Sequence, residues 1–143
     1  GLSMLLGDLS TIVQYKLPVK LIVFNNRALG MVKLEMEVAG LPDWQTDMQN
    51  PDFAKVAEAM GMKNFTIRHS EEVASVMGEA FDFDGPVLVN VMTDPNALAM
   101  PPQVEWEQMV GMFKSMYKLL LNGKGKEVID TIRSNYKHIR EVL

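Results

Sequence analysis

The residues best suited to chemistry form one short segment, Asn25-Asn26-Arg27-Ala28-Leu29-Gly30, which follows an apolar run over residues 20–24. The run has the composition of a buried parallel strand, and open α/β sheets bind ligands beyond the carboxyl ends of such strands. Amide side-chain oxygens and backbone carbonyls are hard ligands that suit Mg²⁺, especially where a phosphate supplies further oxygens. The segment is therefore a candidate magnesium site. Taken alone, however, Asn-Asn fits an ordinary turn from a strand into a helix better.

The elements that must position this segment alternate between helices and strands. The hydrophobic pattern predicts helices over residues 4–15, 29–38, 51–60 and 70–81, and short strands over residues 20–24, 65–67 and 87–92. In the third helix, Asn50 is the predicted N-cap, Pro51 suits the first helical position and Asp52 suits the positive end of the dipole. The alternation predicts an α/β fold, a three-layer open and mostly parallel sheet with helices on both faces.

The pattern changes after Met100-Pro101-Pro102-Gln103. A helix is expected over residues 104–121, and a last helix begins at about Lys126 after a Gly-rich break. We therefore expect a partial α/β domain over residues 1–100 and a C-terminal helical tail over residues 101–143. The chain opens on Gly1-Leu2-Ser3-Met4, without an initiator Met or a polar linker, which indicates a piece of a longer polypeptide cut inside a structural unit.

The amino-acid composition excludes several classes of function. The 143 residues carry 14 Lys+Arg against 18 Asp+Glu, and this acidic balance argues against a nucleic-acid binder. The absence of cysteine excludes disulfides, a thiol nucleophile and thiolate zinc, and two histidines cannot build a three-histidine metal site within one chain. No apolar run approaches the roughly 18 residues that a membrane span needs.

The order of short motifs resembles the thiamine-diphosphate enzymes. In that family Gly-Asp-Gly precedes Asn-Asn at a spacing that would place Gly1 directly after it, since 24 residues precede Asn25. The similarity continues through Leu17-Pro18-Val19-Lys20, Phe24-Asn25-Asn26, Asp52-Phe53-Ala54, Asp84-Gly85-Pro86-Val87 and Pro101-Pro102-Gln103, and so covers nearly the whole chain. Within the family, the chain resembles the C-terminal cofactor-binding domain of bacterial pyruvate oxidases, which are pyruvate:quinone oxidoreductases.

The resemblance assigns roles to individual residues. It implies that Asn26 gives its side-chain oxygen and Ala28 its main-chain carbonyl to Mg²⁺, and that Gly1 lies against the diphosphate. The other residues expected at the cofactor are Leu2, Ser3, Leu29 and Gly30. The residues expected to face the thiazolium and the bound pyruvate, and hence the catalytic candidates, are Met31, Val32 and Glu35.

The resemblance also implies parts that lie outside this chain. The Gly-Asp-Gly aspartate precedes Gly1, the glutamate that activates thiamine diphosphate belongs to another domain, and FAD binds a middle domain. We therefore expect the chain alone to be inactive. The expected partners are pyruvate and the other domains and subunits of a homo-oligomer, expected to be a tetramer. The parent enzyme would decarboxylate pyruvate and pass electrons through FAD to quinone or to oxygen.

Two alternatives remain open. Acetolactate synthases resemble this chain at Leu29-Gly30-Met31-Val32, and Met31 stands where pyruvate oxidases usually have Phe. Acetolactate synthases, however, generally carry Trp where this chain has Glu35, and they lack a tail of this kind, so both features favour the oxidase. The second alternative is a non-catalytic interaction module.

The last helix has one broad apolar face with a basic complement. The apolar residues of the face are Ile129, Ile132, Tyr136, Ile139 and Leu143, and the basic residues are Lys126, Arg133, Lys137 and Arg140. Such a helix either lies on a membrane surface or packs on a neighbouring domain. We expect a cytoplasmic protein, peripheral at the inner face of the cell membrane if the tail binds lipid.

Overall fold

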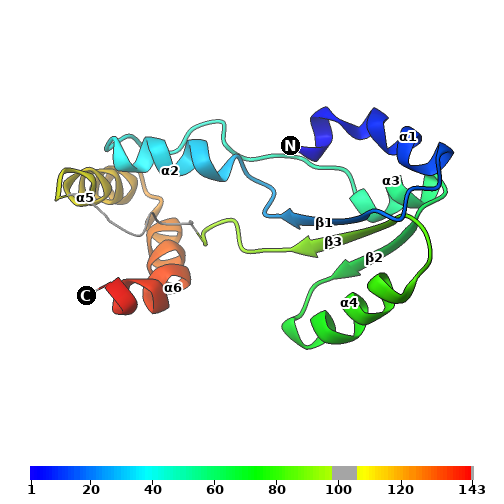
Figure 1. The fold of residues 1–143 in the computed structure, drawn as a ribbon. Coiled ribbons are helices and arrows are strands. Elements are labelled where there is room, and N and C mark those ends of the chain that lie inside the picture. The colour runs from blue at the N-terminus through cyan, green and yellow to red at the C-terminus, as the bar shows by residue number, and fades with distance from the viewer. Residues whose placement is uncertain (98–105, 143) are drawn as a thin grey trace. The chain divides into compact units, whose positions relative to one another are not determined.

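The structure is a computed structural model that describes the backbone of residues 1–97 and 106–142, and the side chains within residues 1–97 and 109–135. The chain divides into two compact units (Figure 1). The sheet unit comprises residues 1–25 and 49–93, and the helical unit comprises residues 26–48 and 94–143. Each unit combines segments distant in sequence, and the helical unit draws on both sides of residue 100. A domain boundary at residue 100 stays a prediction.

The sheet unit is built on three parallel strands in the order β1-β3-β2. Their bounds are Lys20–Asn25 for β1, Lys63–Ile67 for β2 and Val87–Met92 for β3. The central strand β3 is buried from Val87 to Asn90. Its nearly continuous apolar sequence explains this position, because a central parallel strand is covered on both faces.

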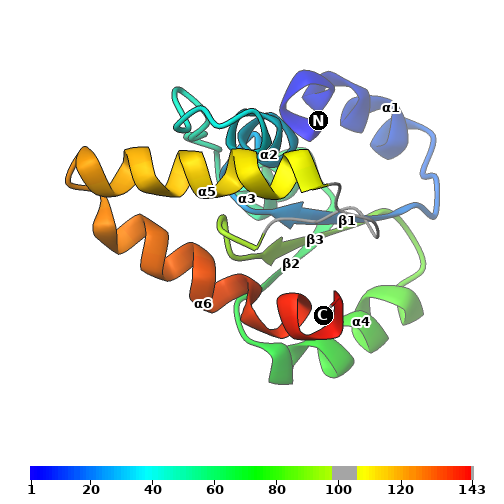
Figure 2. The same ribbon diagram turned by 90° about the vertical axis from the view of Figure 1, so that its left-hand side faces the viewer.

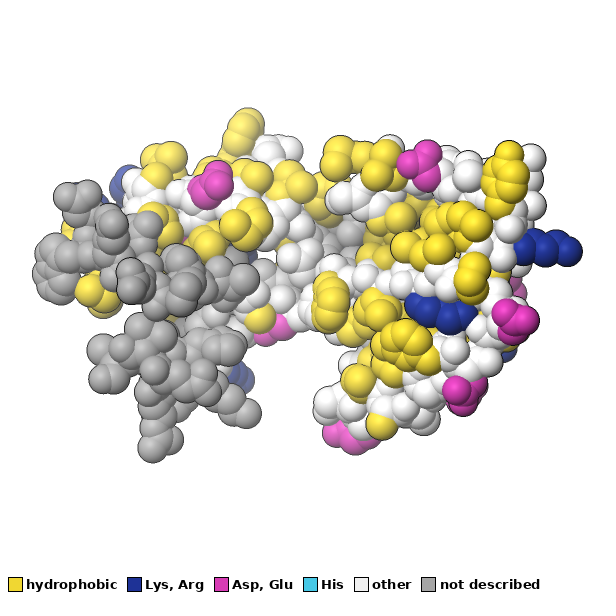
Figure 3. All heavy atoms as spheres, viewed as in Figure 1, with side chains coloured by type: hydrophobic (Ala, Val, Ile, Leu, Met, Phe, Trp, Pro, Cys, Tyr) yellow, Lys and Arg dark blue, Asp and Glu magenta, His cyan; other side chains and the backbone are white. Residues whose placement is uncertain are grey.

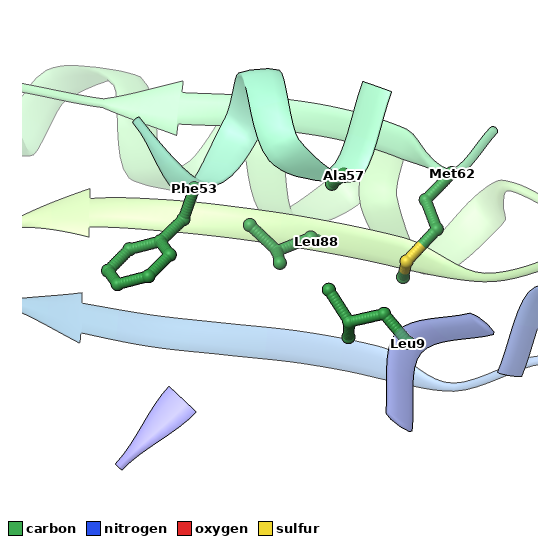
Figure 4. Close-up of a cluster of buried hydrophobic side chains, with 5 residues drawn as sticks. All are labelled: Leu9, Phe53, Ala57, Met62 and Leu88. Carbon is green, nitrogen blue, oxygen red and sulfur yellow. The ribbon is translucent and has the colours of Figure 1, made fainter. Parts of the chain in front are cut away.

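Helices lie on both faces of the sheet, which confirms the predicted α/β class. On one face, α1 (Leu9–Gln14) and α3 (Phe53–Ala59) pack on the sheet, and Figure 4 shows their side chains directed at Leu88 of β3. The buried residues of this cluster are Leu9, Phe53, Ala57, Met62 and Leu88. On the other face, Ala80 of α4 (Val73–Asp82) packs with a second buried cluster from β2 and β3.

The first predicted helix is wrong in its extent. Residues 4–15 do not form one helix: two 3₁₀ turns, Leu2–Met4 and Leu6–Asp8, precede the short α1. Leu5 has a non-helical backbone between the two turns, and Gly7 lies within the second turn. Glycine weakens a helix because it loses the most backbone freedom on folding.

The N-cap predicted for α3 is also wrong. Asp52, not Asn50, is the N-cap, and its carboxylate accepts hydrogen bonds from the backbone N–H groups of Ala54 and Lys55 at 3.1 and 3.3 Å. Pro51 consequently lies before the helix rather than at its first position. Asn50 uses its side chain to contact β1 instead, as described below.

The 3₁₀ turn before α4 is held by a carboxylate that accepts hydrogen bonds from two backbone N–H groups. Glu72 ends the short 3₁₀ turn Ser70–Glu72, so the α-helix begins three residues later than predicted. Its Oε2 accepts hydrogen bonds from the N–H groups of Arg68 and His69 at 2.8 and 3.0 Å. These bonds favour the charged form and lower the pKa of Glu72.

The helical unit consists of α2 (Gly30–Val38), α5 (Trp106–Leu121) and α6 (Gly125–Val142), and contains the loop over residues 39–48. Within this unit α5 packs on both α2 and α6 (Figure 2). The two tail helices lie close to their predicted bounds. Among the described residues, no helix is long and apolar enough to cross a bilayer.

Apolar side chains are exposed in both units. In α6, Val128, Thr131 and Asn135 are buried, whereas Ile129 and Ile132 are exposed; the remaining members of the predicted apolar face, Tyr136, Ile139 and Leu143, lie outside the described side chains. In the sheet unit, Ile22 and Phe24 of β1 are exposed, and Figure 3 shows apolar side chains gathered on the visible face of this unit. We expect self-association of the isolated chain through such surfaces.

Candidate functional site

The first asparagine of the pair is a structural residue. Asn25 ends β1 and is buried, its Nδ2 donating to Asn90 Oδ1 at 3.2 Å and its Oδ1 accepting from Asn50 Nδ2 at 3.0 Å. Its carbonyl also accepts a hydrogen bond from the N–H of Thr93. Asn25 therefore ties together three parts of the sheet unit, and the candidate ligand is its neighbour Asn26.

The second asparagine forms a tight turn. Asn26 Oδ1 accepts a hydrogen bond from the N–H of Ala28 at 3.1 Å, and Arg27 between them has a left-handed backbone with φ of 54°. This side-chain-to-backbone bond holds the amide oxygen beside Ala28. A carboxamide oxygen has two lone pairs, so one of them can still approach a metal ion.

The segment is braced by the loop that follows α2. Ala28 pairs with Asp47 in an antiparallel bridge, in which Leu29 N–H donates to Thr46 O and Met48 N–H donates to Arg27 O, both at 2.8 Å. Because the bridge uses groups of Arg27 and Leu29, it leaves the carbonyl of Ala28 for another partner. The hydrophobic pattern of the sequence does not predict this bracing role of residues 46–48. The length of the loop was the only available signal.

Gly30 leaves room for the Asn26 side chain. A Cβ at residue 30 would lie 2.9 Å from Asn26 Nδ2, which is closer than real Cβ contacts. Any other residue at position 30 would push the asparagine side chain away. The structure thus brings Asn26, Ala28, Leu29 and Gly30 together in one turn.

The three catalytic candidates share the exposed side of α2. Met31, Val32 and Glu35 are all exposed. Met31 and Val32 precede Glu35 by four and three residues, the spacings of neighbours on one face of a helix. Leu34 and Glu37 are buried on the other side of α2. Met31 keeps 64% of its surface exposed. The exposed side of α2 is thus open to a ligand or to another chain.

The remaining candidates belong to the sheet unit. Gly1 and Ser3 are exposed at the first 3₁₀ turn, whereas Leu2 packs against the cluster around Leu9 and Leu88. Leu2 is thus in part a core residue. The cofactor contacts expected of these three residues stay predictions.

Comparison with known proteins gives the family. Residues 1–91 match the family described as thiamine pyrophosphate enzyme, C-terminal TPP binding domain. The chain belongs to this family. It is 40% identical over 118 residues to YdaP of Bacillus subtilis (strain 168), a protein named as thiamine pyrophosphate-containing, with 82% of this chain and 20% of YdaP covered.

Acetolactate synthases are similar to this thiamine pyrophosphate domain as well. The large subunit of Pyropia yezoensis is 37% identical over 118 residues, covering 78% of this chain and 20% of that subunit. The isozyme 3 large subunit of Escherichia coli (strain K12) is 37% identical over 121 residues, covering 80% and 21% respectively. The chain thus spans about a fifth of the length of these relatives.

The donor atoms fit a magnesium ion that a diphosphate also holds. Asn26 and Ala28 offer two neutral oxygens, the kind of ligand that Mg²⁺ accepts beside phosphate and carboxylate oxygens. Among the described residues, no group of three or more His, Asp or Glu gathers to hold a metal by itself. The thiamine pyrophosphate domain can therefore contribute part of a metal site, and its charged ligands must come from the cofactor and from other residues.

A carboxyl group is buried on the side of α2 opposite the catalytic candidates. Glu37 is 5% exposed and faces a small cavity of about 10 Å³ in the helical unit. The other lining residues are Met112, Ser115, Met116, Leu119, Val128 and Thr131. Burial raises the pKa of Glu37 above its ordinary value of 4.5, Lys33 opposes this rise and Asp43 adds to it.

This raised pKa predicts a stability that falls with pH. The folded chain holds the Glu37 proton more tightly than the unfolded chain, so the free energy of unfolding decreases as pH rises from about 4.5 through the raised pKa. Glu37→Gln removes this ionisation, and we expect a flatter pH profile and a more stable chain at pH 8 than the wild type. Urea unfolding between pH 4 and pH 8 measures both. Glu35→Gln, on the exposed side of α2, keeps the buried carboxyl and should retain the slope; an equal slope in Glu37→Gln would contradict the prediction.

Proposed function

We propose that the full-length protein is a thiamine-diphosphate-dependent enzyme that forms acetolactate, as the names of its acetolactate synthase relatives state. The main support is the identity of 37% to two acetolactate synthase large subunits over about four-fifths of this chain. The sequence Leu29-Gly30-Met31-Val32 at the start of α2, which resembles acetolactate synthases, agrees with it.

In this proposal the chain would hold part of the cofactor. Asn26 and Ala28 would bind Mg²⁺ with their side-chain and main-chain oxygens, and Gly1 would contact the diphosphate. Thiamine diphosphate, when bound, would supply a carbon nucleophile for the carbonyl of a 2-oxo acid and would accept the electron pair on loss of CO₂. Met31 and Val32 provide an apolar wall that keeps water from the reacting carbon. Glu35, one helical turn further on, offers a carboxylate for orienting the substrate.

Pyruvate oxidation is the second candidate. Glu35 stands where acetolactate synthases generally carry Trp, and α6 exposes Ile129 and Ile132 in a tail that the synthases are expected to lack. On this alternative, FAD in another domain accepts the electrons and passes them to quinone or oxygen, and α6 contacts the cell membrane. On either alternative, we expect pyruvate as a substrate and a homo-oligomer, a tetramer on the pyruvate oxidase resemblance, whose other domains complete the site.

Product analysis of the full-length protein distinguishes the alternatives. The protein is incubated with thiamine diphosphate, Mg²⁺, FAD and pyruvate without oxygen, while flavin absorbance and acetolactate are followed together. The proposal predicts acetolactate without bleaching of the flavin. Bleaching without acetolactate would instead establish the oxidase. If neither occurs and thiamine diphosphate does not bind, the chain belongs to a non-catalytic module.

A further inference from the structure

The C-terminal end of α2 lies directly against α5 at a glycine. A Cβ at Gly111 of α5 would lie 1.7 Å from the carbonyl oxygen of Val38 and 2.8 Å from its carbon. Real Cβ atoms essentially never approach another atom closer than 3.0 Å, and here the neighbour is backbone, which cannot rotate away. Only glycine at residue 111 therefore allows the two helices to cross at this distance (Figure 2).

A second glycine faces the first at the same crossing. Gly40 has φ of +74°, and its N–H donates to Glu37 O at 3.0 Å while Leu41 N–H donates to Met36 O at 2.9 Å. This is the Schellman arrangement that ends a helix on a left-handed glycine. A Cβ at Gly40 would lie 3.4 Å from Gly111 O. The end of α2 and Gly111 of α5 thus have complementary shapes.

Two side chains of α5 bind carbonyls just beyond α2. Ser115 Oγ donates to Leu41 O at 3.0 Å, and Lys118 Nζ donates to Gly40 O at 2.8 Å. With Gly111 they occupy positions i, i+4 and i+7, which lie on one face of a helix. The C-terminal end of a helix carries partial negative charge, so the Lys118 ammonium group beside it is favourable, and both hydrogen bonds hold the chain just after α2 against α5.

We propose that α5 positions residues 26–30, and that Gly111 sets the distance between α5 and the C-terminal end of α2. The proposal rests on the proposed roles of Asn26 and Ala28 in binding Mg²⁺. A helix of nine residues, about 13 Å long, moves as a unit, so a displacement at Val38 is carried to Gly30. The Asn26 side chain occupies the space beside Gly30 where a Cβ would lie, and the displacement therefore changes the position of the proposed metal-binding oxygen.

The variant Gly111→Ala tests this coupling in the full-length protein. Its methyl group forces α2 and α5 apart by roughly 1 Å, and a misplacement of this size costs on the order of 100-fold at a catalytic site. We expect at least a tenfold higher Kd for thiamine diphosphate with Mg²⁺, measured by calorimetry. We also expect faster hydrogen exchange in residues 26–38. Ser115→Ala, which adds no bulk, removes one hydrogen bond of about 1 kcal/mol and should raise the same Kd about fivefold.

Gly125→Ala is the matched control within the helical unit. A Cβ there meets only the Leu120 side chain at 3.6 Å, an ordinary contact, so cofactor Kd and exchange in residues 26–38 should stay as in the wild type. A lower Tm in Gly111→Ala and Ser115→Ala with unchanged Kd and exchange would overturn the proposal, since it would show a merely stabilising role. If the wild type itself does not bind thiamine diphosphate, the proposed function fails, and hydrogen exchange alone then decides whether Gly111 controls α2.

Discussion

Replacing Asn26 by alanine is expected to weaken Mg²⁺ binding by the full-length protein on the order of 10- to 100-fold, the range seen when groups supporting a metal site are removed. The variant loses the one side-chain oxygen that the turn holds beside Ala28. If the metal and the diphosphate bind together as proposed, the Mg²⁺ concentration that gives half-maximal activity should rise by the same factor. Titration with Mg²⁺ at saturating thiamine diphosphate measures this concentration.

Asn26→Asp is the matched comparison for this prediction. It keeps a side-chain oxygen that can accept the Ala28 N–H, and adds a negative charge that Mg²⁺ tolerates. We therefore expect a much smaller loss of Mg²⁺ affinity than in Asn26→Ala. If Asn26→Ala required no more Mg²⁺ than the wild type, Asn26 would be only a turn residue, the plain alternative that its sequence also allows.

Leu88→Ala is expected to produce the largest loss of stability. Leu88 is fully buried on the central strand β3, where Leu9, Phe53, Ala57 and Met62 surround it (Figure 4). Removing its side chain leaves a cavity between the sheet and the helices α1 and α3, and such substitutions cost about 2–5 kcal/mol. Urea unfolding of the 143-residue chain should show a lower midpoint with an unchanged slope.

Leu5→Ala is the control for the core substitution. Leu5 lies in the same unit and is 59% exposed, so its truncation should change the free energy of unfolding by no more than about 0.5 kcal/mol. Equal losses in the two variants would mean that the α1–α3 face of the sheet is not the core of this unit.

The two sides of α2 have different environments and different proposed roles. Leu34 and Glu37 are buried within the helical unit, and the catalytic candidates Met31, Val32 and Glu35 are exposed. If the proposed function holds, the side facing away from the unit completes a site with groups from elsewhere in the full-length protein. This division explains how a chain of about a fifth of its relatives' length can carry a recognisable part of a cofactor site.

Sequence patterns determined the parts of this protein that depend on local composition. The apolar run of β3 and the helical spacing of α4 predicted the parallel α/β sheet, because burial on both faces requires continuous apolar strands. The order of motifs around Asn25-Asn26 likewise led to the thiamine pyrophosphate enzymes. It favoured pyruvate oxidase, whereas the comparisons with known proteins support acetolactate synthase better.

Only the tertiary structure decided which of several suitable residues does what. Asn25 and Asn26 are the same residue type but have different roles. Asn25 is hydrogen-bonded to Asn90 and Asn50, whereas Asn26 forms a tight turn. Asn50 does not cap α3, because its side chain donates a hydrogen bond to Asn25 instead. Gly111 of α5 lies against Val38 at the end of α2, although the two residues are 73 positions apart in the sequence. Such choices depend on groups distant in sequence that meet only after folding, and local propensity carries no information about them.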